Sequence, residues 1–314
     1  MNKENLPIII AGPTASGKTG AALALAKISG GEIISVDSRQ VYKFINAGTA
    51  APKGEWQGGF YKVDGIKYHL VDFLDLNEVF DVSRFCHASE DITSGRTGTQ
   101  FIFAGGTGMY MQGYFSGMDK LPEADPAIRA ELAVLAEEKG RGYLHKMLAS
   151  FDEASAAAIP AGNIHRVIRA IELYRLTGKP ASVLRTGKYK AEFPKEKVLA
   201  FYMDWDRDEL EKRIISRTEA IFEPMAEEAQ AVLKMGYKRD CPGLKSLGYR
   251  EALEYIDGKI GKREALDKII ILTRQYAKRQ RTWFRRYDDI IRIKCSSDKS
   301  DEDIAKEILL WKER

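Results

Sequence analysis

A glycine-rich loop near the start of the chain limits the possible folds more than any other feature. Residues 12–19, GPTASGKT, match the phosphate-loop pattern G-x-x-x-x-G-K-[ST] at every defined position. An apolar segment that we expect to form a strand, Leu6–Ala11, precedes the loop, and an alanine-rich segment that we expect to form a helix, Thr19–Ile28, follows it. A second expected strand, Glu32–Val36, completes a βαβ unit, which is typical of a parallel sheet.

The loop predicts a phosphate-binding site. Its glycines let backbone N–H groups turn toward phosphate oxygens, Lys18 supplies a cation, and the Thr19 hydroxyl can hold Mg²⁺. The loop recognises phosphate, and not the group to which the phosphate is attached. A small-molecule kinase and another phosphate-displacing enzyme therefore both remain open at this point. The residues expected to contact phosphate are Gly12, Thr14, Ala15, Ser16, Gly17, Lys18 and Thr19.

Two further apolar segments extend the expected sheet. Gln100–Ala104 runs into a second glycine turn, GGTG at 105–108, and Lys197–Met203 precedes a charged helix. Because the carboxyl ends of parallel strands meet at one edge of a sheet, α/β folds bind ligands in a crevice there. We expect an α/β fold: a P-loop NTPase-like parallel sheet core with an inserted all-helical subdomain and a helical C-terminal region.

The insertion is predicted between these two strands, where the sequence is helical in pattern and contains no credible strand. We place the core in residues 1–118 and 181–314 and the insertion in residues 119–180. Pro224 is expected to break or kink the helix that contains it. The expected helices are Pro126–Lys139, Gly142–Ser150, Glu153–Ala158 and Ile164–Thr177 in the insertion, and Arg207–Leu233, Tyr249–Ile256, Lys262–Tyr287 and Asp301–Lys312 after it.

Asp37 follows the second expected strand and should therefore lie beside the glycine loop. One interpretation is structural, with Asp37 or Ser38 as an N-cap residue of the next turn. The other interpretation is chemical. Asp37 would be a general base, which requires an amine or hydroxyl as the second reactant, and Arg39 and Gln40 would recognise the edge of a base.

A basic segment near the C-terminus is hidden by the near-neutral composition of the whole chain. The 49 Lys and Arg against 45 Asp and Glu give a formal charge of +4, yet residues 273–294 hold eight Lys or Arg and two Asp. A basic segment of this kind forms either an ordinary solvated surface or a binding surface for nucleic-acid phosphates. On a helix, the cations that share one face are Arg274, Lys278, Arg281 and Arg285. The aromatic residues that line another face are Tyr276, Trp283 and Tyr287.

Other classes of protein are not favoured. No apolar run approaches the roughly 20 residues of a membrane-spanning helix, so we expect no membrane partner. The three cysteines lack C-x-x-C spacing and predict neither a structural zinc site nor a disulfide framework. A cytoplasmic location is the resulting expectation.

Seven sequence blocks carry a specific resemblance to a known family. They are GPTASGKT at 12–19, SVDSRQVYK at 35–43, AGGTGMY at 104–110, LPEADPAIR at 121–129, RVIRAIE at 166–172, LGYREAL at 247–253 and TRQYAKRQRTWFRR at 273–286. In this order they resemble the bacterial tRNA dimethylallyltransferases, also called the tRNA isopentenyltransferase or IPP transferase family. The resemblance implies transfer of a dimethylallyl group from dimethylallyl diphosphate to N6 of the adenosine adjacent to the anticodon, position 37 of tRNA. Diphosphate is released, and Mg²⁺ is the implied cofactor.

The resemblance also implies roles for individual residues. Asp37 would accept the N6 proton, Thr19 would hold Mg²⁺ or a phosphate oxygen, and Arg217 would help to bind the diphosphate. The glycine loop would hold the diphosphate leaving group. The residues that would contact the anticodon stem-loop of tRNA are Asp37, Ser38, Arg39, Gln40, Thr107, Arg129, His165, Arg166, Arg169, Lys278 and Arg281.

Three functions thus stand as alternatives. The first is a tRNA-modifying prenyltransferase, for which a monomer is the default because the partner is large. The second is a small-molecule kinase, or an enzyme that prenylates free AMP, ADP or ATP, and such an enzyme has no use for the basic face at 273–286. The third is an RNA-binding module with a vestigial nucleotide site, for which Asp37 and Lys18 would be irrelevant to binding.

Overall fold

The computed structural model describes residues 6–186 and 192–312 of the chain. Contacts within the chain divide it into two compact units. We call Met1–Ser116 together with Ala191–Arg314 the core unit, and Gly117–Lys190 the helical unit. The described residues 181–186 thus belong to the helical unit rather than to the core, in which they were expected.

The core unit is built on an eight-stranded sheet in the order β3-β4-β5-β2-β6-β1-β7-β8. Six strands from β5 to β8 pair in parallel, and the β3–β4–β5 edge is antiparallel. In register, Ala11 and Val36 both lie opposite Gly105, so the segments that follow these three residues leave the sheet at one edge. The strands are β1 (Ile8–Ala11), β2 (Glu32–Val36), β3 (Glu55–Gln57), β4 (Phe60–Val63), β5 (Ile66–His69), β6 (Phe101–Gly105), β7 (Leu199–Trp205) and β8 (Ile291–Cys295).

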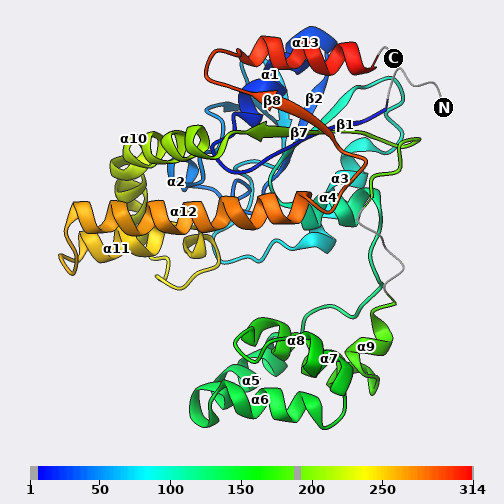
Figure 1. Ribbon diagram of the computed structural model, residues 1–314. Coiled ribbons are helices and arrows are strands. Elements are labelled where there is room, and N and C mark those ends of the chain that lie inside the picture. Colours follow the sequence, from blue (N-terminus) through cyan, green and yellow to red (C-terminus); the bar gives the residue numbers. More distant parts are fainter. Residues whose placement is uncertain (1–5, 187–191, 313–314) are drawn as a thin grey trace. The chain divides into compact units, whose positions relative to one another are not determined.

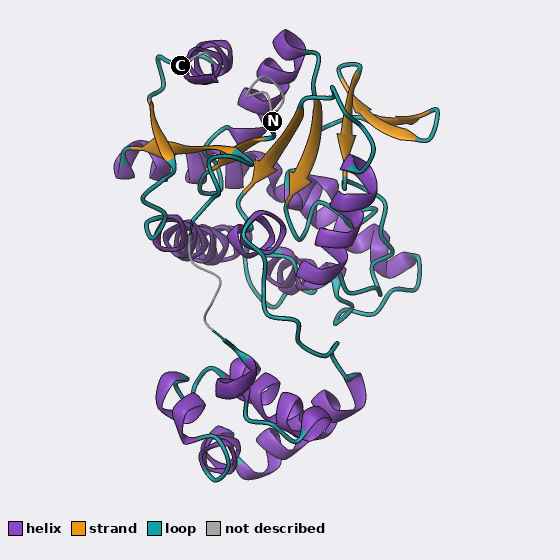
Figure 2. Ribbon diagram, turned by 90° about the vertical axis from the view of Figure 1, so that its right-hand side faces the viewer, coloured by secondary structure: helices purple, strands orange, loops and turns teal. Residues whose placement is uncertain are grey.

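Helices cover both faces of this sheet (Figures 1 and 2). Ile8 and Ile10 of β1 pack in one apolar cluster with α1 (Lys18–Ser29) and α13 (Asp301–Lys312). Ile9 and Ala11 face a second cluster on the other side. Since both faces are covered, the central strands are apolar throughout. The second cluster is formed by α3 (Val82–Thr93), α4 (Gly108–Phe115), α10 (Arg207–Lys234), α11 (Tyr249–Ile256) and α12 (Lys262–Phe284).

The helical unit has its own apolar core, which includes Leu132, Leu144, Val167 and Ile171. Its helix ends follow from local chemistry. The Asp125 carboxylate accepts the Ala127 and Ile128 N–H groups before a proline at the first helical position, and Gly178 ends α8 with a φ of 70°. The helices are α5 (Pro126–Lys139), α6 (Arg141–Ala149), α7 (Glu153–Ala158), α8 (Ile164–Thr177) and α9 (Ala181–Leu184).

The predicted fold class is confirmed, and most predicted elements lie within two residues of their observed bounds. Of the two effects predicted for Pro224, a break or a kink, the break is wrong, because α10 runs through Pro224 as one helix. This helix bends part-way along in Figure 1. Several elements were not predicted. They are β3, β4, β5, β8, α2 (Asn46–Thr49), α3 and the 3₁₀ turn η2 (Gly243–Lys245).

Candidate active site

A cleft of about 1130 Å³ opens at the carboxyl edge of the sheet in the core unit. The glycine loop and residues 37–40 form part of its wall, as expected from the parallel topology. Helices from distant parts of the sequence supply much of the rest, together with residues of β5 and β6. The side chains used below are Lys18, Thr19, Asp37, Ser38, Arg213, Arg217, Tyr276 and Gln280, all of which line the cleft.

The glycine loop has the backbone conformation needed to present N–H groups. Ala15 (φ 64°) and Gly17 (φ 89°) both adopt left-handed conformations, which turn successive N–H groups of the loop toward one side. Gly12 is required for a close approach, because a Cβ atom there would lie 2.7 Å from the Ser16 hydroxyl oxygen. That hydroxyl is buried and has no hydrogen-bond partner among the described residues. An anion in the loop would supply one.

Side chains from three elements fix the outer backbone atoms of the loop. Lys18 Nζ donates to the Pro13 carbonyl (2.7 Å), Arg213 Nε to the Ala15 carbonyl (2.8 Å) and Trp205 Nε1 to the Ser16 carbonyl (2.8 Å). Arg213 also stacks over the Trp205 ring, 4.3 Å from its centroid. These three carbonyl groups thus have partners within the protein. Of the loop N–H groups, that of Thr14 donates to Gln280 Oε1 and that of Ser16 to the Pro13 carbonyl, and the others remain for a ligand.

Positive charge gathers at the loop without a matching number of carboxylates. Burial and the charge of Arg217 together lower the pKa of Lys18 to about 7, although Asp37 partly offsets both. Burial also lowers the pKa of Arg217, again opposed by Asp37. Among the described residues, neither Lys18, Arg213 nor Arg217 forms a salt bridge. This arrangement favours a multiply charged anion, which would stabilise the protonated forms.

Asp37 combines both interpretations of its position. Its Oδ1 accepts the Arg39 N–H (2.8 Å) and the Gln40 N–H (3.3 Å), so the capping turn is present. Within residues 6–186 and 192–312, no partner is found for Oδ2. One oxygen therefore fixes the carboxylate, and the other is available to accept a proton.

The three residues after Asp37 differ in how many of their polar groups are already bonded within the protein. Arg39 Nη1 donates to the Pro242 carbonyl (3.1 Å). Gln40 is buried, its Oε1 accepts from the Ser35 hydroxyl (2.9 Å) and its Nε2 donates to the Ala50 carbonyl (3.1 Å). Both ends of the Gln40 amide thus have partners within the protein, and its predicted contact with RNA stays a prediction. Ser38 lines the cleft.

The second glycine turn packs against the inner face of α12. A Cβ atom on Gly106 would lie 2.0 Å from Gln280 Nε2, and one on Gly108 would lie 2.1 Å from the Trp283 ring. Burial raises the pKa of Tyr276, the charge of Asp37 raises it further, and the Thr107 hydroxyl opposes the shift. Thr107 therefore lies beside Tyr276, and its hydroxyl is buried.

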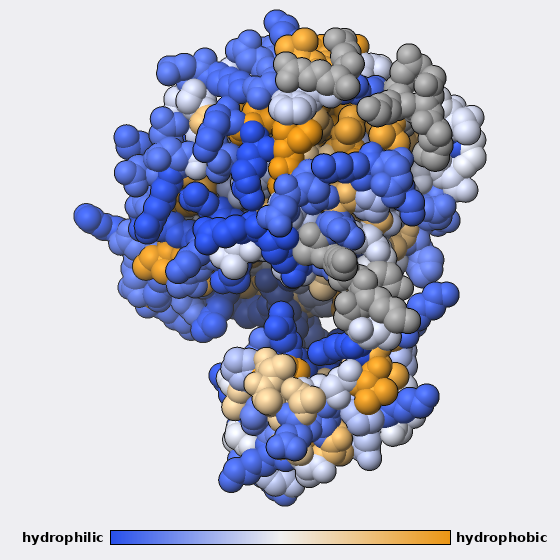
Figure 3. Space-filling model, turned by 45° about the vertical axis from the view of Figure 1, so that its right-hand side comes forward, coloured by the Kyte–Doolittle hydropathy of each residue, from blue (hydrophilic) through white to orange (hydrophobic). Residues whose placement is uncertain are grey.

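The outer face of α12 carries the predicted basic row. Lys278 and Arg285 are exposed and Arg281 is partly buried, whereas Arg274 pairs with Glu211 (2.6 Å). On the face that Figure 3 shows, apolar groups form scattered patches among hydrophilic ones. No helix in the described part of the chain is both long and apolar enough to cross a membrane.

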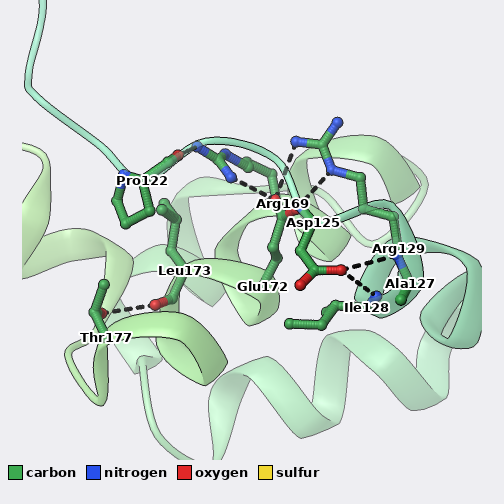
Figure 4. A network of polar contacts seen from close by, with 9 residues as sticks. All are labelled: Pro122, Asp125, Ala127, Ile128, Arg129, Arg169, Glu172, Leu173 and Thr177. Carbon is green, nitrogen blue, oxygen red and sulfur yellow. Dashed lines mark hydrogen bonds and ion pairs between the residues drawn. The ribbon is translucent and has the colours of Figure 1, made fainter.

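In the helical unit, two of the four predicted RNA contacts take part in an internal network (Figure 4). Glu172 is fully buried, and its carboxylate accepts from Arg129 (2.9 and 3.0 Å), Arg169 (2.5 Å) and the Asp125 N–H (2.7 Å). Burial alone would raise the pKa of Glu172, but hydrogen bonds from both arginines hold it below its usual range. His165 and Arg166 are exposed at the start of α8.

Comparison with known proteins decides the family. The family model described as "IPP transferase" matches residues 40–287. The chain belongs to the IPP transferase family. A second family model, "Isopentenyl transferase", matches residues 7–59. The tRNA dimethylallyltransferase of Elusimicrobium minutum is 52% identical over 98% of this chain and 100% of its own length, and that of Acetivibrio thermocellus is 37% identical over 96% and 95%.

Solved structures agree with this assignment. The tRNA isopentenylpyrophosphate transferase of Bacillus halodurans superposes with a TM-score of 0.65 at 32% identity, covering 99% of this chain and 97% of that protein. The corresponding enzyme of Staphylococcus epidermidis gives 0.65 at 30% identity, with 97% and 98% covered. A eukaryotic dimethylallyltransferase acting on tRNA shares the fold, with a TM-score of 0.75 at 23% identity and coverage of 98% and 78%.

Three functional candidates of this family member were missed from the sequence. Arg213, Tyr276 and Gln280 all reach the cleft from helices far from the glycine loop. A signal was present for two of them, because Tyr276, Gln280 and Trp283 recur at i, i+4 and i+7 on one helical face. Arg213 has no comparable local pattern and follows only from the tertiary fold.

Proposed function

We propose that this chain is a tRNA dimethylallyltransferase. It transfers the dimethylallyl group of dimethylallyl diphosphate to N6 of the adenosine next to the anticodon, position 37 of tRNA, and releases diphosphate. One observation carries the proposal: a cationic phosphate loop and the partnerless Oδ2 of Asp37 line the same cleft. The assignment of the chain to the IPP transferase family supports it.

The loop side of the cleft fits a diphosphate leaving group. When the allylic carbon–oxygen bond breaks, the electron pair leaves with the diphosphate, whose negative charge increases. The remaining N–H groups of the glycine loop, together with Lys18 and Arg217, line this side of the cleft and would lower the barrier without reorganising. Arg213 keeps the loop in this conformation through its bond to the Ala15 carbonyl.

The Asp37 side of the cleft fits the nucleophile. Adenine N6 is a weak nucleophile because its lone pair is delocalised into the ring. As the N6–carbon bond forms, N6 must lose a proton, and Oδ2 of Asp37 is the group in the cleft that can accept it. Because Oδ1 is tethered by two backbone N–H groups, the carboxylate needs little rearrangement to do so.

The cleft fits a magnesium ion that arrives with the diphosphate, rather than a metal held by the protein alone. Among the described residues, no group of three or more His, Cys, Asp or Glu could hold a metal. Mg²⁺ bound to substrate phosphates needs only one or two protein oxygens. The Thr19 hydroxyl would hold it, and the orphaned Ser16 hydroxyl adds a second polar group to the loop. When bound, the ion would neutralise part of the charge that develops on the leaving group.

We propose that the anticodon stem-loop is the RNA element bound. Lys278 and Arg281 on α12 would contact its phosphates, and Ser38, Arg39, Gln40 and Thr107 would surround the extracted adenosine. In the helical unit, His165 and Arg166 are exposed and would contact RNA directly. Arg129 and Arg169 would do so with the donors that Glu172 leaves unused. We expect the protein to act as a monomer in the cytoplasm, where its tRNA substrate is found.

A product assay tests the proposal. Purified protein, dimethylallyl diphosphate and Mg²⁺ are incubated in parallel with an unmodified anticodon stem-loop, AMP or ATP, and the nucleosides are analysed by mass spectrometry. We expect N6-dimethylallyl adenosine from the stem-loop alone. Product from AMP or ATP only, or turnover of ATP into a phosphorylated small molecule, would overturn the proposal.

A further inference from the structure

Gln280 of α12 joins the two glycine turns of the core unit. Its Oε1 accepts the Thr14 N–H of the phosphate loop (2.8 Å), and its Nε2 donates to the Gly106 carbonyl (3.1 Å). The side chain is 5% exposed, so neither bond competes with bulk water. Thr14 and Gln280 are 266 residues apart in sequence. A single amide therefore ties the phosphate loop to a distant helix.

The atoms around this amide are closely packed. A Cβ atom on Gly106 would lie 2.0 Å from Gln280 Nε2 and 3.2 Å from the Gly12 carbonyl, so the two turns and the side chain are in close contact. Trp283, one turn further along α12, packs equally tightly on Gly108. A shift of α12 along or about its axis must therefore move the Thr14 N–H or break its bond.

The same helix carries the cations proposed to contact RNA. Lys278 and Arg281 are two residues before and one residue after Gln280, within the continuous helix Lys262–Phe284. Lys278 is exposed while Gln280 is buried, so the helix presents one face to solvent and the other to the phosphate loop. RNA that binds the outer face and fixes the position of α12 also fixes the residues on its inner face, because the helix moves as a rigid element.

We infer that Gln280 is a positioning residue that couples RNA binding on α12 to diphosphate binding in the glycine loop. The inference rests on the proposed function, since it takes RNA as the ligand of the outer face. Both ends of the Gln280 amide bond to backbone atoms of the two glycine turns, so Gln280 acts through them. It fixes the Thr14 backbone, and with it the neighbouring N–H donors of the loop, so RNA that holds α12 in place also holds the loop in its anion-binding form. By linkage, diphosphate must then favour RNA binding by the same factor.

The coupling is measured as a ratio of dissociation constants. Inorganic diphosphate with Mg²⁺ is titrated calorimetrically into the full-length protein, with and without a saturating unmodified anticodon stem-loop. We expect the stem-loop to tighten diphosphate binding by at least about fivefold, the lower end of ordinary coupling. Anisotropy of a labelled stem-loop, with and without diphosphate, must return the same factor.

Two substitutions separate coupling from folding. Gln280→Leu removes both hydrogen bonds and leaves the Thr14 N–H and the Gly106 carbonyl without a partner. Gln280→Glu keeps the acceptor for the Thr14 N–H but places an oxygen against the Gly106 carbonyl. Because it keeps the side-chain volume, it serves as the test variant if Gln280→Leu does not fold. Gln230→Leu, the same chemical change at an exposed position of α10, is the matched control.

We expect the ratio to fall to near one in Gln280→Leu and in Gln280→Glu and to stay at the wild-type value in Gln230→Leu. A purely structural role would weaken both ligands separately and leave the ratio unchanged, and that result would overturn the inference. A wild-type ratio of one, with product formed normally, would overturn the inference alone. Failure of the wild type to bind the stem-loop at all would remove the proposed function and this inference with it.

Discussion

The low pKa of Lys18 makes a prediction about pH that can be worked out from the structure. Burial and the neighbouring Arg217 lower the pKa of Lys18 to about 7 in the free protein. A bound diphosphate restores the ammonium form, because its charge stabilises the cation. Diphosphate binding should therefore be linked to proton uptake, and the affinity should fall as the pH rises above 7.

The magnitude follows from the fraction of Lys18 that is protonated before binding. With a pKa of about 7, that fraction is about nine tenths at pH 6, one half at pH 7, one eleventh at pH 8 and one hundredth at pH 9. The apparent dissociation constant rises in inverse proportion, by about tenfold from pH 6 to pH 8. At pH 8, binding should take up about nine tenths of a proton per site.

Lys18→Met provides the reference, since it keeps the length of the side chain and removes the titrating group. Calorimetric titrations of inorganic diphosphate with Mg²⁺ into both proteins at pH 6, 7, 8 and 9 give a ratio of affinities in which the ionisation of diphosphate itself cancels. We expect the advantage of the wild type to shrink by about tenfold between pH 6 and pH 8. A constant ratio over the whole range would refute the assignment of a low pKa to Lys18 or its role in binding.

The remaining predictions concern the carboxylate, the basic helix and the helical unit. Asp37→Asn should lower the rate of prenyl transfer by at least about 100-fold and change stem-loop affinity by less than about twofold, because the general base is lost and the capping oxygen remains; equal losses would assign Asp37 to binding. Lys278→Ala with Arg281→Ala should weaken stem-loop binding and reduce the slope of log K against log salt concentration by about 1.5, and an unchanged slope would contradict the binding surface for phosphates. Glu172→Ala leaves two arginines without their carboxylate and should destabilise the helical unit by about 3 kcal/mol. Urea unfolding of the full chain should show this by circular dichroism and not by fluorescence, because all four tryptophans lie in the core unit; a matching shift in fluorescence would contradict it.

Elements whose ends are encoded locally could be predicted to the residue. Asp125 with Pro126 starts α5 and Gly178 ends α8, where the sequence had placed them. The short strands β3, β4 and β5, of three or four residues each, escaped prediction because their strand character comes from pairing with one another rather than from their own composition. β8 was missed for a similar reason, since its partner β7 lies 86 or more residues earlier.

The candidate site likewise contains residues that the local sequence reveals and residues that only the tertiary fold brings together. The glycine loop and Asp37 were accessible to sequence analysis because contiguous residues build them. Gln280 and Arg213 bond to the loop across 266 and 198 residues of sequence, and only the tertiary fold brings them there. The shared carboxylate of Glu172 likewise could not be inferred, because it depends on how α5 packs against α8.

The most direct test of the central claim is a measurement in cells. The tRNA of a strain that lacks this gene is digested and its nucleosides are analysed by mass spectrometry, alongside the parent strain and strains carrying the wild-type gene or Asp37→Asn. The account predicts that N6-dimethylallyl adenosine is absent from the deletion strain, returns with the wild-type gene and does not return with Asp37→Asn. Unaltered tRNA nucleosides in the deletion strain would contradict it.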